Sequence, residues 1–256
     1  MAESGKKTEV DTQPKKKGAT TPRKGKAKQD RGDNKTYERI KVAALGLFAV
    51  KGVEPTSIRD IGAKANVPTS LLYHYAPSKY QLVYEIMSDG MDRYLASARD
   101  AEAAGVTPED KLAGLISAHI IMHCRNRQLA KVIEHGWRPL PKAEKDIILK
   151  VRDKYSYVWD GVFDAGINDG VFKIEEPRLA RLAFIQMCSI STWYSPNGPH
   201  ETEDLVQHFG ELIFRAISAE RTGKPIHFKD ITALTFADAL GIVEKHHTGA
   251  VFGKKR

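Results

Sequence analysis

The chain has 256 residues, of which 41% are hydrophobic and 28% are charged, and it contains only two cysteines. This composition excludes collagen-like, mucin-like and wholly disordered proteins, and the length suffices for one large domain or two small ones. Forty Lys and Arg against 32 Asp and Glu give a net charge of +8, of which residues 1–35 carry +6 and the rest of the chain only +2. The basic character therefore belongs mainly to the N-terminus.

Residues 1–35 contain no large apolar side chain apart from Met1 and Val10. Such a segment has too little apolar surface to offset the entropy of ordering, so we expect a disordered basic arm. Two roles fit its lysines, namely a nonspecific grip on DNA phosphates through counterion release and a solubilising tail.

No apolar run approaches the roughly 18–20 residues needed to span a bilayer, and the N-terminus lacks the apolar stretch of a secretory signal. Cys124 and Cys188 have no partner at metal-ligand or redox spacing. These features predict a cytoplasmic protein with two reduced thiols and no membrane partner.

From Thr36 onward, apolar residues recur at helical spacing and no alternating strand is apparent. A first helix ends at Gly52, and a short second helix begins at Ser57 with a capping box to Asp60. Pro68 suits the first turn of a third helix. That helix ends near Tyr75 because Pro77 disfavours helical geometry at the residue before it.

A capping box of Ser78 with Gln81 opens a long helix that extends to about Ala103. Pro, Gly and acidic first turns delimit the helices that follow. Their expected ranges are 108–136, 142–166, 177–194, 202–220 and 229–246. The sequence therefore predicts an all-α protein without internal repeats.

Two short helices joined by a three- or four-residue turn, behind a longer helix, form a helix-turn-helix. Residues 57–79 read Ser-Ile-Arg-Asp-Ile-Gly-Ala-Lys-Ala-Asn-Val-Pro-Thr-Ser-Leu-Leu-Tyr-His-Tyr-Ala-Pro-Ser-Lys. This string resembles the signature of the TetR family of bacterial transcriptional repressors, closely over about 36–85 and generically over 36–222. It departs from the common pattern at Ser70, Leu71, Ala76 and Tyr80, so the resemblance carries over no operator sequence.

The resemblance implies a three-helix helix-turn-helix head followed by a helical domain for ligand binding and dimerisation. We expect four parts: the disordered arm over 1–35, the DNA-binding domain over 36–82, the effector-binding and dimerisation domain over 83–222, and a C-terminal extension with an extra helix over 223–256.

The candidate DNA-binding residues lie on the second and third helices and in the first turn of the helix that follows. Hydroxyls of Thr69 and Ser70 can contact several base edges in a major groove, and Leu71 can contact a thymine methyl or pack inward. Lys79 in a first helical turn is disfavoured by the macrodipole, and a DNA phosphate held by the neighbouring backbone N–H groups would resolve this conflict; a solvated lysine is the alternative. The resemblance implies phosphate contacts for Tyr73 and Tyr75. The full set is Ser57, Arg59, Pro68, Thr69, Ser70, Tyr73, His74, Tyr75 and Lys79.

The helices at 177–194 and 202–220 are candidates for the homodimer interface. The first is apolar or small nearly all round, so it must be covered on more than one side. The second has a broad apolar stripe, made by Leu205, Val206, Phe209, Leu212, Ile213, Ala216 and Ile217. The resemblance implies a four-helix dimer interface, and burial of both helices within a monomer is the alternative.

The candidate effector-binding residues are His119, His123, Arg152, Trp159, Phe163, Trp193 and Tyr194. Aromatics at helical spacing fit a core as well as a ligand site. His119 and His123 are spaced as two metal ligands, but no third ligand or catalytic Glu accompanies them, so we expect no metal. The segment Trp193-Tyr-Ser-Pro-Asn-Gly198 is similar to the acyl-CoA-responsive branch of the family, which controls fatty-acid and steroid-ring degradation. Arg152, Arg178 and Arg181 could then bind CoA phosphates or be surface charges.

We therefore expect a ligand-responsive repressor that binds a palindromic operator as a homodimer and is released by a small-molecule effector, with an acyl-CoA thioester as the candidate. The alternative is an effector-independent nonspecific or architectural DNA-binding protein. The sequence has no nucleophile elbow, phosphate loop, zinc signature or dinucleotide fingerprint. We expect neither enzymatic activity nor a cofactor.

Overall fold

The computed structural model describes Met1 and residues 24–247, with side chains of Met1 and of residues 34–247. The chain divides into two units, residues 1–35 and residues 36–256. Of the expected disordered arm, residues 2–23 lie outside the described residues. Helix α1 (Lys24–Lys51) begins well before Thr36, so residues 24–35 are helical rather than irregular. They extend a helix whose later turns are buried, and extension of an existing helix avoids the cost of nucleation.

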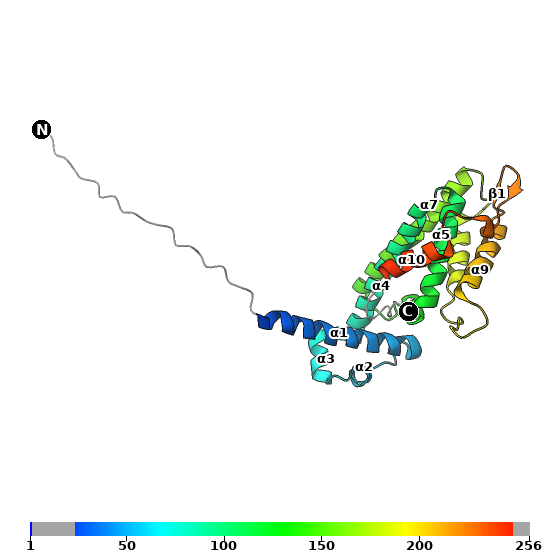
Figure 1. Cartoon of the computed structure of the whole chain (residues 1–256). Coiled ribbons are helices and arrows are strands. Elements are labelled where there is room, and N and C mark those ends of the chain that lie inside the picture. The colour runs from blue at the N-terminus through cyan, green and yellow to red at the C-terminus, as the bar shows by residue number, and fades with distance from the viewer. Residues whose placement is uncertain (2–23, 248–256) are drawn as a thin grey trace. The chain divides into compact units, whose positions relative to one another are not determined.

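Helices α2 (Ile58–Ala65) and α3 (Thr69–Tyr75) follow α1 in the head (Figure 1). The predicted capping box between Ser57 and Asp60 is confirmed, with both hydrogen bonds present. Pro68 is the N-cap residue of α3, one position before the predicted first turn. Asn66 ends α2 in the left-handed region with φ 52°, a conformation that Asn tolerates better than most residues.

Helix α4 (Lys79–Ala104) connects the head, made of α1 to α3, with the body, made of the elements that follow. Its N-cap Ser78 accepts a hydrogen bond from the Gln81 amide. Gln81 does not return the second bond of the predicted capping box, because its side chain donates to Glu85 Oε1 at 2.8 Å. The Tyr37 hydroxyl of α1 also donates to Glu85. Glu85 therefore links the first helix of the head to α4.

Helix α5 (Pro108–Arg125) lies at the centre of the body and contacts α4, α6, α7, α8, α9 and α10. Helices α6 (Arg127–His135) and α7 (Lys142–Asn168) follow it. The single helix expected over 108–136 is wrong, because the chain breaks at Asn126, which ends α5 and begins α6. Most residues of α5 are buried, as its contacts with six helices require.

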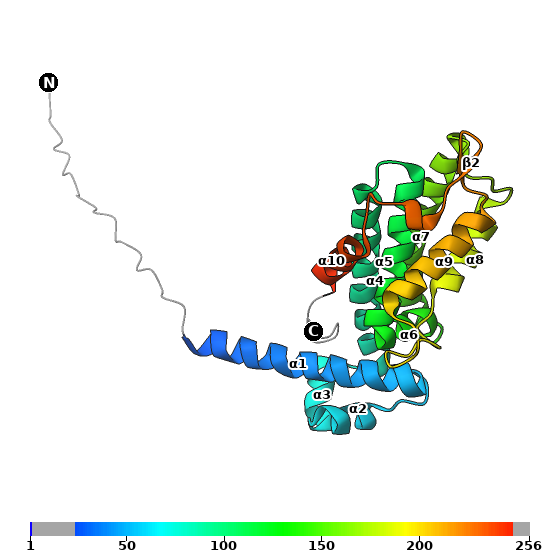
Figure 2. The same cartoon turned by 45° about the vertical axis from the view of Figure 1, so that its right-hand side comes forward.

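Helices α8 (Pro177–Cys188) and α9 (Thr202–Ala216) are shorter than the expected 177–194 and 202–220. Residues 189–201 instead form turns between them, consistent with Pro196 and Pro199 in this segment. Figure 2 shows α9 and α10 on different sides of α5.

The expected helix over 229–246 is shorter and is preceded by other elements. Strands β1 (Glu220–Arg221) and β2 (Lys224–Pro225) pair in an antiparallel hairpin, followed by the 3-10 helix η1 (Phe228–Asp230) and α10 (Phe236–His246). The sequence analysis missed the hairpin because each strand has only two residues. Both turn residues, Thr222 and Gly223, have positive φ, as a two-residue hairpin loop of the I′ kind requires.

One hydrophobic cluster runs through the head and the body, from Ile40 of α1 to Val243 of α10. The C-terminal segment is attached to this body by polar contacts as well. Arg93 donates to the His246 carbonyl at 2.6 Å, and Lys245 lies 2.7 Å from Asp100 of α4. Arg221 forms a bidentate pair with the buried carboxylate of Glu109. None of the helices in the described part of the chain combines the length and the apolar character that a membrane-spanning segment needs.

Candidate DNA-binding surface and effector site

The head exposes most of the predicted DNA-binding residues on one surface. Ser57, Arg59, Pro68, Thr69, Ser70, Tyr73 and His74 are exposed, and Leu71 is exposed rather than packed inward. Their neighbour Leu72 is fully buried and fixes α3 against the core. A helix with one buried anchor and several exposed polar side chains is suited to lie in a groove of DNA.

An open hollow of about 670 Å³ lies between the turn before α2, the start of α3 and the start of α4. Five of the nine predicted residues line it, namely Ser57, Arg59, Thr69, Tyr73 and Lys79. The backbone of α2 at Gly62 lies close to the α2–α3 connection: a Cβ added at Gly62 would lie 3.0 Å from the Val67 carbonyl oxygen. The short α2–α3 connection therefore depends on a small residue in α2.

Two predicted residues are engaged within the head. Lys79 Nζ donates to the Glu54 carbonyl at 2.5 Å and lies 3.5 Å from the Glu54 carboxylate. A phosphate would have to compete with these contacts. Tyr75 is half-buried, and its ring stacks on Tyr37 of α1 with centroids 5.6 Å apart. Tyr75 thus packs α3 against α1, a role that its position in the sequence did not indicate.

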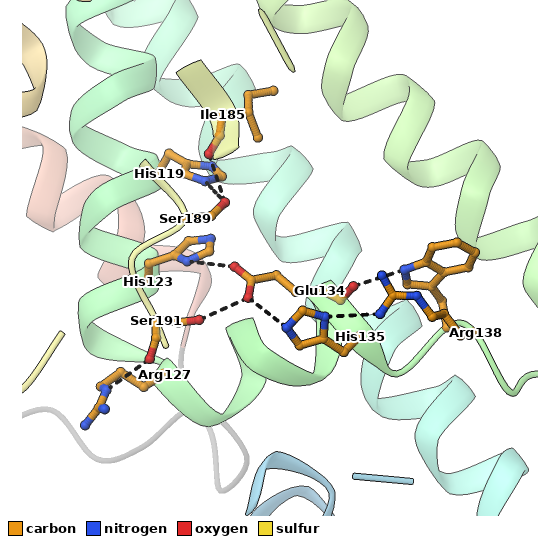
Figure 3. A network of polar contacts seen from close by, with 10 residues as sticks. His119, His123, Arg127, Glu134, His135, Arg138, Ile185, Ser189 and Ser191 are labelled. Carbon is orange, nitrogen blue, oxygen red and sulfur yellow. Dashed lines mark hydrogen bonds and ion pairs between the residues drawn. The ribbon is translucent and has the colours of Figure 1, made fainter. Parts of the chain in front are cut away.

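The body holds a buried polar cluster around α5 (Figure 3). His119 and His123 stack with ring centroids 4.5 Å apart. His119 Nδ1 lies 2.6 Å from the Tyr155 hydroxyl, and its Nε2 lies 3.2 Å from Ser189 Oγ. Burial lowers the pKa of His119 to about 3 and also holds the pKa of His123 well below 6.5. Both imidazoles are therefore neutral at physiological pH.

Glu134 of α6 joins this cluster from the other side (Figure 3). One carboxylate oxygen lies 3.5 Å from His123 Nδ1, and the other accepts from Ser191 Oγ at 3.3 Å. Desolvation raises the pKa of Glu134. Because His123 is neutral, this contact does not neutralise the carboxylate as a salt bridge would.

Two buried polar atoms of the cluster, Tyr94 Oη and His123 Nδ1, lack a hydrogen-bond partner among the described residues. Trp159 Nε1 is near the Tyr155 hydroxyl but does not form a well-oriented hydrogen bond with it. An unsatisfied buried polar group costs about 1–3 kcal/mol. The cluster can therefore offer hydrogen-bonding groups to a polar atom of a ligand.

The structure brings together four of the seven predicted effector residues. His119, His123, Trp159 and Phe163 are buried and form one chain of ring contacts. The other three are not part of this chain of rings. Trp193 is 56% exposed, Tyr194 packs beside Thr202, and Arg152 lies over the Trp137 ring.

The sequence analysis did not select Tyr94, Ser189 or Ser191, and no local pattern marks them. Ser189 is 70 positions from His119, and only the packing of α8 against α5 brings the two together. Arg181, considered for CoA phosphates, is 2.9 Å from Asp160 and is already paired. Among the described residues, no three His, Cys, Asp or Glu side chains are grouped in a way that could hold a metal ion.

A helix-turn-helix with an exposed third helix, followed by a helical body, defines the class of helix-turn-helix DNA-binding regulators. Residues 40–86 match the family model for bacterial regulatory proteins of the tetR family, and residues 105–217 match that for the tetracyclin repressor-like C-terminal domain. Together the two models match well over half of the chain. The protein belongs to the TetR family of bacterial transcriptional regulators.

Relatives and solved structures agree with this family. The chain is 26% identical over 191 residues to the HTH-type transcriptional repressor KstR2 of Mycolicibacterium smegmatis, covering 73% of this chain and 92% of the relative. A tetR-family regulatory protein from Rhodococcus RHA1 is 26% identical, with a TM-score of 0.69 over 73% of this chain and 99% of that one. AibR, solved in complex with isovaleryl coenzyme A and operator DNA, shares the fold at 23% identity, with a TM-score of 0.65 over 69% of this chain and 97% of that one.

Proposed function

We propose that this protein is a homodimeric transcriptional repressor that binds a palindromic operator in the cytoplasm and is released by a CoA thioester. The observation that carries the DNA-binding part is the exposed set on α2 and α3, where Arg59, Thr69 and Tyr73 line one hollow of the head. Arg can pair with guanine or phosphate, and the hydroxyls can contact base edges or phosphates. The related KstR2 is named a repressor, which supports the same direction of control here.

Two adjacent apolar surfaces support the homodimer. On α8, Leu179, Leu182 and Ala183 are exposed at helical spacing, and on α9 Leu212 is 54% exposed beside the half-buried Phe209. The predicted α9 stripe is mostly internal, since Leu205, Val206, Ile213 and Ile217 are buried. A second copy would cover the remaining surface, and two-fold pairing would present two α3 helices to successive major grooves.

The buried polar cluster supports an effector site in each body. The unpartnered hydroxyl of Tyr94 belongs to a ring that lies beside those of His123 and Tyr155, an environment suited to an apolar ligand with a polar group. The complex of AibR with isovaleryl coenzyme A supports a CoA thioester as the class of ligand. Release from DNA then requires that the effector bind one conformation of the dimer more tightly than the other.

Operator binding is tested by selecting duplexes from a random library with the full-length protein and titrating the enriched sequence. We expect a palindrome. Arg59→Ala and Tyr73→Ala should each weaken binding by about tenfold, as expected for one lost charged or polar contact. Tyr157→Ala is the matched control, because Tyr157 is exposed to a similar extent on α7. Enrichment without a palindrome would instead support a nonspecific DNA-binding protein.

The effector is tested by thermal shift with acyl-CoA thioesters, the corresponding free acids and cationic drugs. We expect stabilisation by a thioester and loss of that stabilisation in Tyr94→Phe, which removes the unpartnered hydroxyl and little volume. Stabilisation by free acids or drugs alone would contradict the CoA class, while leaving the proposed operator binding intact.

A further inference from the structure

Three cations surround Trp137 at the corner between α6 and α7. Arg138 Cζ, Lys145 Nζ and Arg152 Cζ lie 5.5, 5.4 and 5.4 Å from the centre of the indole ring. The Trp137 N–H donates to the Glu134 carbonyl at 3.0 Å, which fixes the orientation of the ring. Three positive charges, one from the loop and two from different turns of α7, therefore surround the indole ring through cation–π contacts.

Among the described residues, none of these three cations forms a close ion pair with a carboxylate, although the charges of Glu134 and Asp153 favour the charged form of Arg152. Other cations of the body are paired, such as Lys142 with Asp146 at 2.8 Å and Arg221 with Glu109 at 2.8 Å. The nearby carboxylate of Glu134 turns instead toward His123 and Ser191 (Figure 3).

Arg152 provides a second indication that this corner can bind an anion. Its Nη1 atom is buried and has no hydrogen-bond partner among the described residues. Burial and the neighbouring Arg138 both disfavour the charged guanidinium and lower its pKa. Because Arg152 is partly removed from water and lies near another cation, a bound anion would stabilise its charge.

We propose that the Trp137 corner binds the phosphate groups of the CoA thioester, with Arg138, Lys145 and Arg152 as the binding residues and Trp137 as the positioning residue. This inference rests on the proposed effector class and locates its nucleotide end. Two guanidinium groups and an ammonium suit several phosphates close together, because arginine pairs with phosphate in a bidentate manner and lysine as a point charge.

The position of the corner links the effector site to the head. Glu134, one turn before Trp137, contacts the buried cluster at His123. His135 and Gly136 line a cleft of about 550 Å³ together with Val50 and Lys51 at the end of α1. A ligand with its acyl group at the cluster and its phosphates at the corner would contact the residues on both sides of the last turn of α6. This turn lines the cleft that faces the end of α1 in the head.

The test is isothermal titration of the full-length protein with isovaleryl-CoA, palmitoyl-CoA, coenzyme A and the two free acids. We expect Arg138→Ala and Lys145→Ala each to weaken thioester binding by about tenfold and the double variant by about 100-fold, with no change for the free acids. Lys142→Ala, on the same helix but paired with Asp146, is the matched control and should change affinity less than twofold. Arg152→Lys keeps the charge of the half-buried position and tests bidentate pairing separately.

Thioester binding that survives the double variant unchanged would overturn the inference and leave the proposed effector class standing. If no CoA compound bound, both the phosphate site and the proposed effector class would be wrong. Operator titration of the same samples would still test the proposed repressor function. Weaker operator binding with unchanged thioester binding would assign the corner to DNA phosphates and would also overturn the inference.

Discussion

The head and the body place their functional polar groups in opposite environments. In the head, Arg59 and Tyr73 are exposed, and they are positioned by a neighbouring cap and by the buried residues Ile61 of α2 and Leu72 of α3. In the body, His119 and His123 are almost completely buried, and their partners come from α6, α7 and the end of α8.

In the head, the side chains available for recognition contribute little to stability. In the body, the same side chains contribute to both. An exposed side chain of the head can be removed with little effect on folding, because water replaces its contacts. A buried polar or aromatic group of the body contributes to packing as well as to any ligand, so its removal changes both.

Trp159→Ala should reduce the free energy of unfolding by about 3–5 kcal/mol, because a fully buried indole leaves a cavity. Tyr73→Ala in the head, where the ring is 54% exposed, should change it by less than about 0.5 kcal/mol. Urea unfolding monitored by circular dichroism measures both. Equal destabilisation by the two substitutions would contradict the contrast between the regions.

Leu182→Glu should convert the dimer to a monomer and weaken operator binding by roughly 100-fold, because two linked heads bind with higher avidity than one. The introduced carboxylate would be desolvated in an apolar interface. Light scattering and operator titration give the readouts, and the helical content should be retained. Val106→Glu is the control, since Val106 is exposed in the connection before α5. A dimer that persists in Leu182→Glu would exclude α8 from the interface.

Ser57→Ala should cost about 1 kcal/mol of stability, because it removes the side-chain acceptor at the N-cap of α2. Ser70→Ala, an exposed residue of α3 outside any cap, should leave stability unchanged and affect only operator binding. Urea unfolding distinguishes the two. If Ser57→Ala were neutral, the cap would not be what positions Arg59.

Asp100→Asn should cost roughly 0.5 kcal/mol, since its pairs with Lys245 and His246 are partly exposed. The hydrogen bond from Lys245, followed by that from His246, lowers the pKa of Asp100 below its ordinary 3.8. The stabilisation is therefore complete above pH 3.8 and is lost as the pH falls through the lowered pKa. Urea titrations at pH 7 and pH 3 should show a smaller difference between wild type and variant at the lower pH, and Asp92→Asn should show none. A constant difference would mean that the pair does not attach α10 to α4.

The head was largely predictable because its signals are local. The capping box at Ser57 and the proline at 77 lie within a few residues of the helix ends they determine, and both ends were predicted correctly. The break between α5 and α6 at Asn126 was not predicted because it has no such local signal. No Pro or Gly marks it, and the chain bends there so that the apolar face of α6 can pack beside α5.

The all-α class and the helix-turn-helix were predictable from the sequence alone, because helix periodicity and capping act over a few residues. Only the tertiary structure decided which residues share the buried cluster, that Trp193 stays outside it, and that three cations meet at Trp137. It also decided that most of the α9 stripe faces inward. The physical reason is that periodicity defines one face of a helix, whereas the neighbour that covers this face is chosen by packing between segments far apart in the chain.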